Sequence, residues 1–298
     1  MNSIRTLFLT VTLLFLLSAP GVIAEEPQVD TVVISTGREG GSYYSIGSRL
    51  KGVMMSRQQT MVEVVPSRGS LENLILLDDP ASNVSLALTQ ADALAAYVQK
   101  KPEFGDRFIV IGDLGNECAI LVTGSQDSLE SVQDLKNTKG TEISVDTAHS
   151  GAALTLLQMA ALDPGFATLT PVYVDVLQAL LQIKTASPHS KLRALLLMQR
   201  PSAVPESVRI ILDNPDSYRI VPILEPDVGN VKLPDGSLVY TFEKVAVGGR
   251  ERPKSIAVET LCTRGLLLAS KSKLSRDARS TLSRMMLQSG AEVIGRTD

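Results

Sequence analysis

The residues best suited to chemistry form a glycine-rich turn near the N-terminus. An apolar run of strand type at residues 32–34 leads into a segment that contains Gly37, Gly40 and Gly41, and a helical pattern follows at once. Such a turn presents backbone N–H groups at a helix N-terminus, where the helix dipole favours negative charge. Glycine also adopts positive φ and lets a ligand approach the backbone closely. We therefore predict a binding site here for a small anionic or zwitterionic molecule.

A second turn of the same kind follows a strand predicted at residues 142–145. It contains Asp146, His149, Ser150 and Gly151, and a helical pattern covers residues 153–162. The chain thus repeats one arrangement, in which a strand, a turn of small residues and a helix succeed one another. Two similar halves that each offer a helix N-terminus indicate two lobes with a cleft between them.

Strand and helix patterns alternate along the rest of the chain. Strands are predicted at residues 61–65, 84–88, 108–111, 119–122, 171–176, 193–198, 219–223 and 238–241. Helices are predicted at residues 43–54, 70–75, 91–99, 129–135 and about 275–294, and Ser70 is expected to cap its helix through its hydroxyl. Strands separated by helices imply parallel pairing with helices on both faces, so the predicted fold class is α/β.

The first residues have the pattern of an export signal. Arg5 precedes an apolar core at residues 7–17, and small residues lead to Ala24. A membrane anchor needs about 20 apolar residues, and this core stops well short of that length. We predict a signal peptide over residues 1–24, cleaved after Ala24, and a periplasmic location for the mature chain.

Composition narrows the class of protein. Hydrophobic residues make up 44% and charged residues 20% of the 298 residues, which excludes a disordered chain. The net charge of −3 gives no electrostatic reason to expect a nucleic-acid partner. Cys118 and Cys262 each lie in an apolar run, and we interpret them either as a disulfide or as two separate buried thiols. Two Cys and two His far apart in sequence give no metal-ligand spacing, so we predict neither a metal nor a cofactor.

Catalytic motifs are weak in this chain. Residues 48–51 match S-x-x-K, but the companion motifs S-D-N and K-T-G are absent from the sequence, and Leu50 lies on the buried helical face. The sequence also lacks G-x-S-x-G and H-E-x-x-H. We therefore expect a binding protein rather than an enzyme, and a secreted enzyme of unknown chemistry is the more distant alternative.

Three motifs in a fixed order give the chain a resemblance to a known family. They are Ser35-Thr36-Gly37 with the run from Gly40 to Gly47, then Gly69-Ser70-Leu71-Glu72-Asn73-Leu74, then Gln90-Ala91-Asp92-Ala93. Behind a signal peptide they resemble the TAXI group of extracytoplasmic solute receptors, which serve tripartite ATP-independent periplasmic (TRAP-type) transporters. The resemblance covers most of the mature chain and is strongest up to Asp92.

The resemblance implies a two-lobed type II periplasmic-binding-protein fold with a ligand cleft between the lobes. Lobe 1 would comprise residues 25–122 and 256–298, and lobe 2 would comprise residues 123–255. The implied crossings near residues 121–122 and 257–258 lie close to Cys118 and Cys262, which makes a hinge disulfide a hypothesis. The lobes would close on a ligand, and the closed monomer would dock on TRAP-type permease subunits in the membrane.

The chain departs from the family pattern in two places. Asp146 stands where the family usually has a glycine, and Ala152 stands where it has a hydroxyl residue. An acidic Asp146 opposes a simple anion site, so we expect a ligand that carries an amino group, with His149 supplying positive charge at mildly acid pH. The chain also ends earlier than family members usually do, which puts permease docking or lobe stability in doubt.

The predicted ligand contacts come from the two turns and from the strand ends between them. Tyr44 is interpreted as facing the cleft, with packing in the core as its alternative. Arg38 and Arg68 are the nearest fixed positive charges, with solvent exposure as their alternative. The full predicted set is Gly40, Gly41, Ser42, Tyr44, Arg68, Ser70, Gln90, His149, Ser150 and Gly151. The predicted function is capture of a small carboxylate or an amino acid such as glutamate, and the alternative is a periplasmic ligand-sensing subunit of a signalling system.

Overall fold

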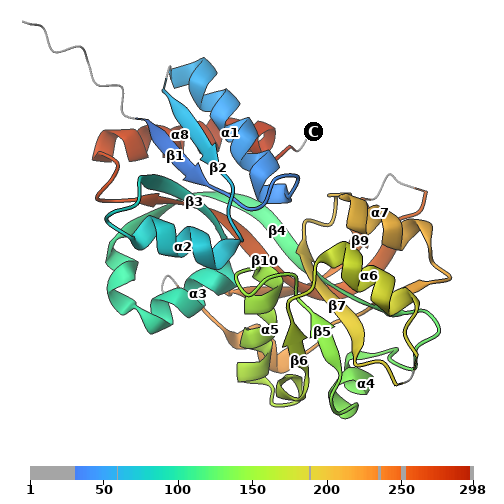
Figure 1. Cartoon of the computed structure of the whole chain (residues 1–298). Helices are drawn as coiled ribbons and strands as arrows, with labels where there is room; N and C mark the ends of the chain where they lie inside the picture. The colour runs from blue at the N-terminus through green and yellow to red at the C-terminus, as the bar shows by residue number, and fades with distance from the viewer. Residues whose placement is uncertain (1–30, 59, 188, 234–235, 250–252, 296–298) are drawn as a thin grey trace, which may run out of the picture.

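Two α/β lobes lie side by side in the computed structural model, which describes residues 31–58, 60–187, 189–233, 236–249 and 253–295 (Figure 1). The predicted signal peptide lies outside these residues. Over the part of the chain that the structure describes, none of the helices has the length and apolar character needed to cross a membrane.

The first lobe is built on three parallel strands. β1 (Val32–Ser35) lies between β2 (Val62–Val65) and β3 (Val84–Gln90) and runs parallel to both. These strands lead into α1 (Ser42–Gln58), α2 (Ser70–Asp78) and α3 (Ala91–Lys100), and η1 (Pro102–Asp106) follows α3. α8 (Arg276–Ile294) packs beside α1. Because parallel strands end at one edge of a sheet, the three turns that start these helices gather at that edge.

The second lobe repeats this plan. β5 (Glu142–Ser144) lies between β6 (Thr170–Val172) and β7 (Leu192–Gln199) and runs parallel to both. These strands lead into α5 (Gly151–Leu162), α6 (Val176–Lys184) and α7 (Glu206–Asp213). The remaining elements are α4 (Val132–Asn137), η2 (Phe166–Thr168), β8 (Tyr218–Val221), η3 (Pro226–Asn230) and β9 (Tyr240–Val247).

Two long antiparallel strands, β4 (Phe108–Gly124) and β10 (Ile256–Ser270), run through both lobes (Figure 1). β10 pairs with β3 in the first lobe and with β9 in the second. β4 pairs with β10 over its first part and with β7 and β8 over its last part. The predicted lobe boundaries fall within β4 and directly before β10, and they stay a prediction.

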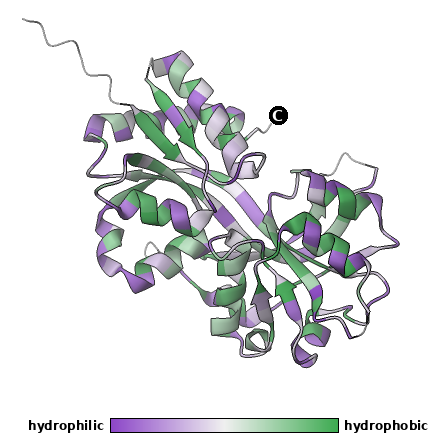
Figure 2. Ribbon diagram, viewed as in Figure 1, coloured by the Kyte–Doolittle hydropathy of each residue, from purple (hydrophilic) through white to green (hydrophobic). Residues whose placement is uncertain are grey.

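Apolar side chains concentrate on the strands and on the inner faces of the helices, while polar residues cover the outer helix faces (Figure 2). In the first lobe, Ile46, Leu50 and Val53 of α1 are buried together with Leu282 and Met286 of α8. Their spacing of three and four residues gives α1 one apolar face, as the sequence pattern predicts. Burial of each such side chain stabilises the fold by roughly 1.5–3 kcal/mol.

Several predicted elements differ from the observed ones. The strands predicted at residues 108–111 and 119–122 are one continuous strand, β4, because β10 supplies hydrogen-bond partners to the polar residues between them. The strand predicted at residues 171–176 ends at Val172, and α6 starts at Val176 because the Asp175 carboxylate accepts from the N–H of Leu177 at 2.9 Å. The helices α6 and α7 were not predicted from the sequence pattern.

A disulfide joins the two lobe-crossing strands. Cys118 and Cys262 face each other as paired residues of β4 and β10, and both are almost fully buried. The bond closes a loop with a sequence separation of 144 residues. It therefore restricts the unfolded chain strongly and fixes the strands where they pass between the lobes.

We predict that the double variant C118A/C262A lowers the free energy of unfolding by as much as about 5 kcal/mol, the chain-entropy value for so long a loop. Urea denaturation of the variant and of the wild type measures this difference. The control is the wild type in excess reducing agent. Its denaturation midpoint should lie at the same urea concentration as that of the variant. A variant as stable as the oxidised wild type would contradict the prediction.

Candidate functional site

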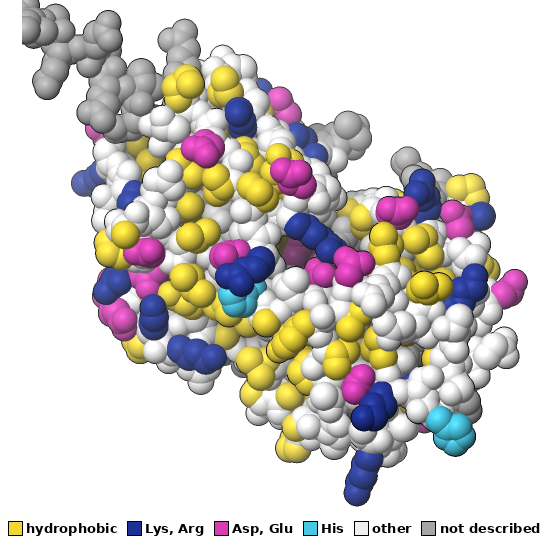
Figure 3. Space-filling view, in the orientation of Figure 1, with side chains coloured by type: hydrophobic (Ala, Val, Ile, Leu, Met, Phe, Trp, Pro, Cys, Tyr) yellow, Lys and Arg dark blue, Asp and Glu magenta, His cyan; other side chains and the backbone are white. Residues whose placement is uncertain are grey.

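A cavity of about 300 Å³ lies between the two lobes. Figure 3 shows the hollow, with basic and acidic side chains around its opening. Its walls come from the turn before α1, the start of α2 and the end of β3 in the first lobe, and from the turn before α5 and the end of β7 in the second. Among the residues predicted as ligand contacts, those that line it are Gly40, Gly41, Ser42, Arg68, Ser70, Gln90, Ser150 and Gly151.

The two lobes touch at two glycines. A Cβ on Gly69 would come within 2.6 Å of the His149 carbonyl oxygen, and Gly69 has a φ of 132°, which side chains rarely adopt. A Cβ on Gly151 would overlap the side-chain amide of Gln90. A side chain at Gly69 would meet the backbone of the second lobe, and one at Gly151 would meet the Gln90 side chain. The turns at the starts of α2 and α5 therefore meet across the cleft.

Polar contacts add to this approach. The Thr147 hydroxyl donates to the Arg68 carbonyl oxygen at 3.2 Å, and the Gln199 side chain donates to Ser42 Oγ at 3.0 Å. Arg38 Nη1 lies 3.2 Å from a carboxylate oxygen of Asp146. Each pair joins one lobe to the other, so the lobes are held together on both sides of the cavity.

Asn73 organises the first-lobe wall. Its side chain is fully buried, and Nδ2 donates to the carbonyl oxygens of Leu88 at 2.6 Å and of Thr36. Its Oδ1 accepts from the Ser35 hydroxyl at 2.5 Å. One amide thus ties the ends of β1 and β3 to α2, and this role accounts for an asparagine within the motif Gly69–Leu74.

The capping role predicted for Ser70 is wrong. Gly69 occupies the N-cap position of α2, and Ser70 is the first helical residue. The Ser70 Oγ accepts instead from the Gln90 N–H at 3.3 Å. Ser150, by contrast, does cap its helix, because its Oγ accepts from the Ala153 N–H at 3.0 Å.

Tyr43, and not the predicted Tyr44, lines the cleft. Its side chain is 8% exposed, and its hydroxyl is buried with no hydrogen-bond partner among the described residues. The hydroxyl lies near Gly265 of β10, 3.5 Å from the place that a Cβ would take. Burial first, and then the negative charges of Glu117 and Asp92, raise the pKa of Tyr43.

The ligand contacts predicted for His149 and Arg68 stay predictions. His149 is absent from the cavity wall, and its Nδ1 is buried without a partner among the described residues. Its carbonyl oxygen faces Gly69, so the turn directs the backbone toward the first lobe. Arg68 lines the cavity, but its guanidinium pairs at 2.8 Å with Glu72 of the following helix, α2.

Glu117 is a cleft residue that the sequence analysis missed. It lies on β4, is 6% exposed, and accepts from the Gln90 side-chain amide at 2.8 Å. Burial raises the pKa of Glu117 to about 7, against the hydrogen bond from Gln90, the nearby Tyr43 hydroxyl and the charge of Arg200, which lower it. An acidic residue directly before the buried run at residues 118–122 was the available signal.

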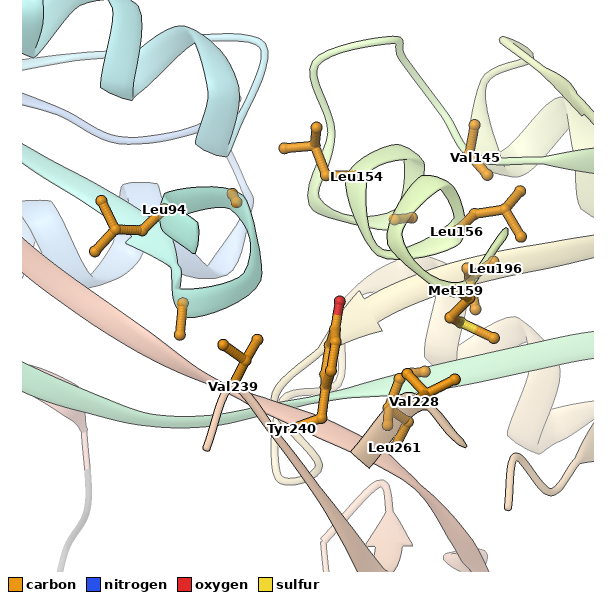
Figure 4. Close-up of a cluster of buried hydrophobic side chains, with 14 of the residues drawn as sticks. Leu94, Val145, Leu154, Leu156, Met159, Leu196, Val228, Val239, Tyr240 and Leu261 are labelled. Carbon is orange, nitrogen blue, oxygen red and sulfur yellow. The ribbon is translucent and has the colours of Figure 1, made fainter. Parts of the chain in front are cut away.

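A second buried carboxylate, Asp92, lies behind the cleft. It accepts from the Tyr240 hydroxyl at 3.0 Å and from the Thr155 hydroxyl, so α3, β9 and α5 meet at one oxygen. Figure 4 shows Tyr240 between Leu94 on one side and Leu156 and Met159 on the other. Burial raises the pKa of Asp92, while these hydrogen bonds lower it. The cleft is therefore acidic at its base and carries its arginines at the opening.

The predicted fold class is confirmed. One solved structure, described as that of a periplasmic transporter, matches with 13% identity and a TM-score of 0.53 over 87% of this chain and 82% of its own. XAC2383 from Xanthomonas citri, bound to ATP, matches with 10% identity and a TM-score of 0.51 over 90% and 88% of the two chains. These likenesses establish a two-lobed type II periplasmic-binding-protein fold.

The family follows from the sequence itself. Residues 34–234 match the NMT1-like family, and this chain belongs to it. No curated protein sequence matches the chain. The matched residues include every wall of the cleft except the β10 segment beneath Tyr43.

The raised pKa of Glu117 predicts a pH-dependent stability. The folded protein binds this proton up to about pH 7, whereas the unfolded chain releases it near 4.5. Ionised Glu117 therefore destabilises the fold. The resulting loss in the free energy of unfolding is about zero below pH 4.5 and about 3 kcal/mol above pH 7. We predict that E117Q is more stable than the wild type at pH 8 and gains nothing at pH 4.5, in unfolding without added ligand.

The matched control is E63Q, which removes a carboxylate from an exposed position on β2. Asp92 is present in all three proteins, so the comparison reports the titration of Glu117 together with its coupling to Asp92. Stability curves of E117Q and wild type that run parallel from pH 4.5 to 8 would disprove the assignment.

Proposed function

We propose that this protein is an extracytoplasmic solute-binding protein that captures a small carboxylate or amino-acid-like ligand between its lobes. The observation that carries the proposal is the convergence of polar groups from both lobes on one cavity of about 300 Å³. A cavity of this size suits a small metabolite. The signal peptide over residues 1–24 and the periplasmic location are parts of the same proposal.

The proposed mechanism is capture by closure. N–H groups in the first turns of α1 and α5 have no partner within their own helices, and both helices start at the cavity. These groups and the dipoles of the two helices favour a carboxylate of the ligand. Contacts between Arg38 and Asp146 and between Thr147 and Arg68 form only when the lobes meet. A ligand that touches both lobes therefore shifts the protein toward the closed form.

The side chains at the cavity favour binding over catalysis. Two of the serines at the cleft use their hydroxyls within the protein, since Ser70 accepts from the Gln90 N–H and Ser150 accepts from the Ala153 N–H. Within the described ranges, neither is hydrogen-bonded to a histidine that would activate it as a nucleophile. We propose that the protein has no enzymatic activity.

The proposed partners are TRAP-type permease subunits, to which the closed monomer delivers its ligand. This part rests on the resemblance to the TAXI receptors through the motifs at residues 35–47, 69–74 and 90–93. Two of these motifs place Ser70 and Gln90 at the cavity. The sensing alternative stays a prediction.

A thermal-shift screen tests the proposed function. At about 100 times its dissociation constant, a ligand stabilises the folded protein by about 2.7 kcal/mol, which raises the melting temperature by roughly 5 to 10 °C in a chain of this size. We predict such a rise with at least one amino acid or organic acid, and none with neutral sugars. Stabilisation by sugars alone would contradict the proposal.

A further inference from the structure

Three hydrogen-bond acceptors lie together at the base of the cleft. Glu117 on β4, Gln90 at the end of β3 and Tyr43 in the first turn of α1 all line the same cavity and are at most 8% exposed. Gln90 Nε2 donates to Glu117 Oε2 at 2.8 Å, which turns the amide so that Oε1 faces away from the carboxylate. The group comes from three elements and is held in place by packing.

Two of these acceptors have no hydrogen bond within the described protein. Gln90 Oε1 and the Tyr43 hydroxyl are buried, and neither has a partner among the described residues. Buried polar atoms without a partner are rare because each costs free energy. Two of them beside a buried carboxylate point to a ligand that supplies donors.

The surrounding charges favour a cationic donor. The charged or titratable groups that act on Glu117 are Tyr43 on α1, Asp92 on α3 and Arg200 after β7. Arg200 Nη1 donates to the Ile294 carbonyl oxygen at 2.6 Å, at the end of α8. Asp92 adds negative charge, and burial makes ionised Glu117 costly unless a positive group pairs with it.

We propose that Glu117, Gln90 and Tyr43 form a subsite for the primary ammonium group of the ligand, an inference that rests on the proposed function. An ammonium group carries three N–H donors and one positive charge. It matches one carboxylate, one amide oxygen and one phenol oxygen. The nearby starts of α1 and α5 suit the carboxylate of the same molecule, so the ligand class is an α-amino acid rather than a simple organic acid.

The test compares ligands that differ only in the amino group. Common L-amino acids are titrated by calorimetry against the matching acids without an α-amino group, such as L-glutamate against glutarate. We expect the wild type to bind at least one amino acid more than about tenfold tighter than its partner acid. In E117Q the affinity for that amino acid should fall roughly 30-fold or more, and the preference over the partner acid should disappear.

Two further variants separate binding from folding. E63Q, on the exposed face of β2, should bind like the wild type. Y43F removes only the hydroxyl that has no partner among the described residues, so it should weaken amino-acid binding without lowering the melting temperature of the protein measured without ligand.

The possible outcomes separate this inference from the proposed function. Equal binding of amino acid and partner acid would overturn the ammonium subsite and leave solute capture intact. An amino-acid preference that survives in E117Q would overturn the assignment of the subsite to Glu117. Failure of every amino acid and every partner acid to bind would overturn both the subsite and the proposed function.

Discussion

Gly151 packs against the side-chain amide of Gln90, and Gly69 packs against the carbonyl oxygen of His149. A side chain at Gly69 would meet the backbone of the second lobe, whereas one at Gly151 would displace the Gln90 amide or move the lobes apart. The polar groups of the cleft come from opposite lobes, so they converge on one small molecule only while this approach is kept. Interlobe pairs such as Arg38 with Asp146 are exposed and add little on their own.

The two strands that run through both lobes, β4 and β10, let the lobes return to the same close contact. β4 pairs with β10 from Phe108 to Cys118, both strands belong to both lobes, and they are joined at Cys118 and Cys262. Motion of one lobe relative to the other is thereby limited to the region where these strands pass between them. Behind the cleft, Asp92 accepts hydrogen bonds from Tyr240 and Thr155 and so ties α3 of the first lobe to α5 of the second.

Much of this arrangement could be predicted from local sequence, because glycine and serine at the end of a strand indicate a turn that starts a helix. The turns with Gly40, Gly41, Ser150 and Gly151 lie at the cavity as their patterns predict. The alternation of strands and helices likewise led to the confirmed fold class. Such signals depend on neighbours in the chain, which a sequence shows directly.

The remaining site residues depend on partners that are distant in sequence. Tyr43 lines the cleft although helical phase alone selects Tyr44, and its hydroxyl lies near Gly265 of the distant strand β10. Glu117 lies inside a strand whose middle is polar, and only its pairing with β10 shows that the strand is continuous. Both residues carry a cost in stability, which is typical of positions selected for a ligand rather than for the fold.

The affinity of G151A for the acid that stabilises the wild type most tests whether the lobes must touch for a ligand to bind. Gly151 starts α5, so alanine suits its backbone, and the only conflict is with Gln90 across the cleft. We predict that the affinity falls by about tenfold or more while the melting temperature without ligand changes little. Gly52, a helical glycine with open space around it, provides the control variant G52A, which should bind like the wild type. Wild-type affinity in G151A would show that close contact of the lobes is not needed for binding, and the account would fail.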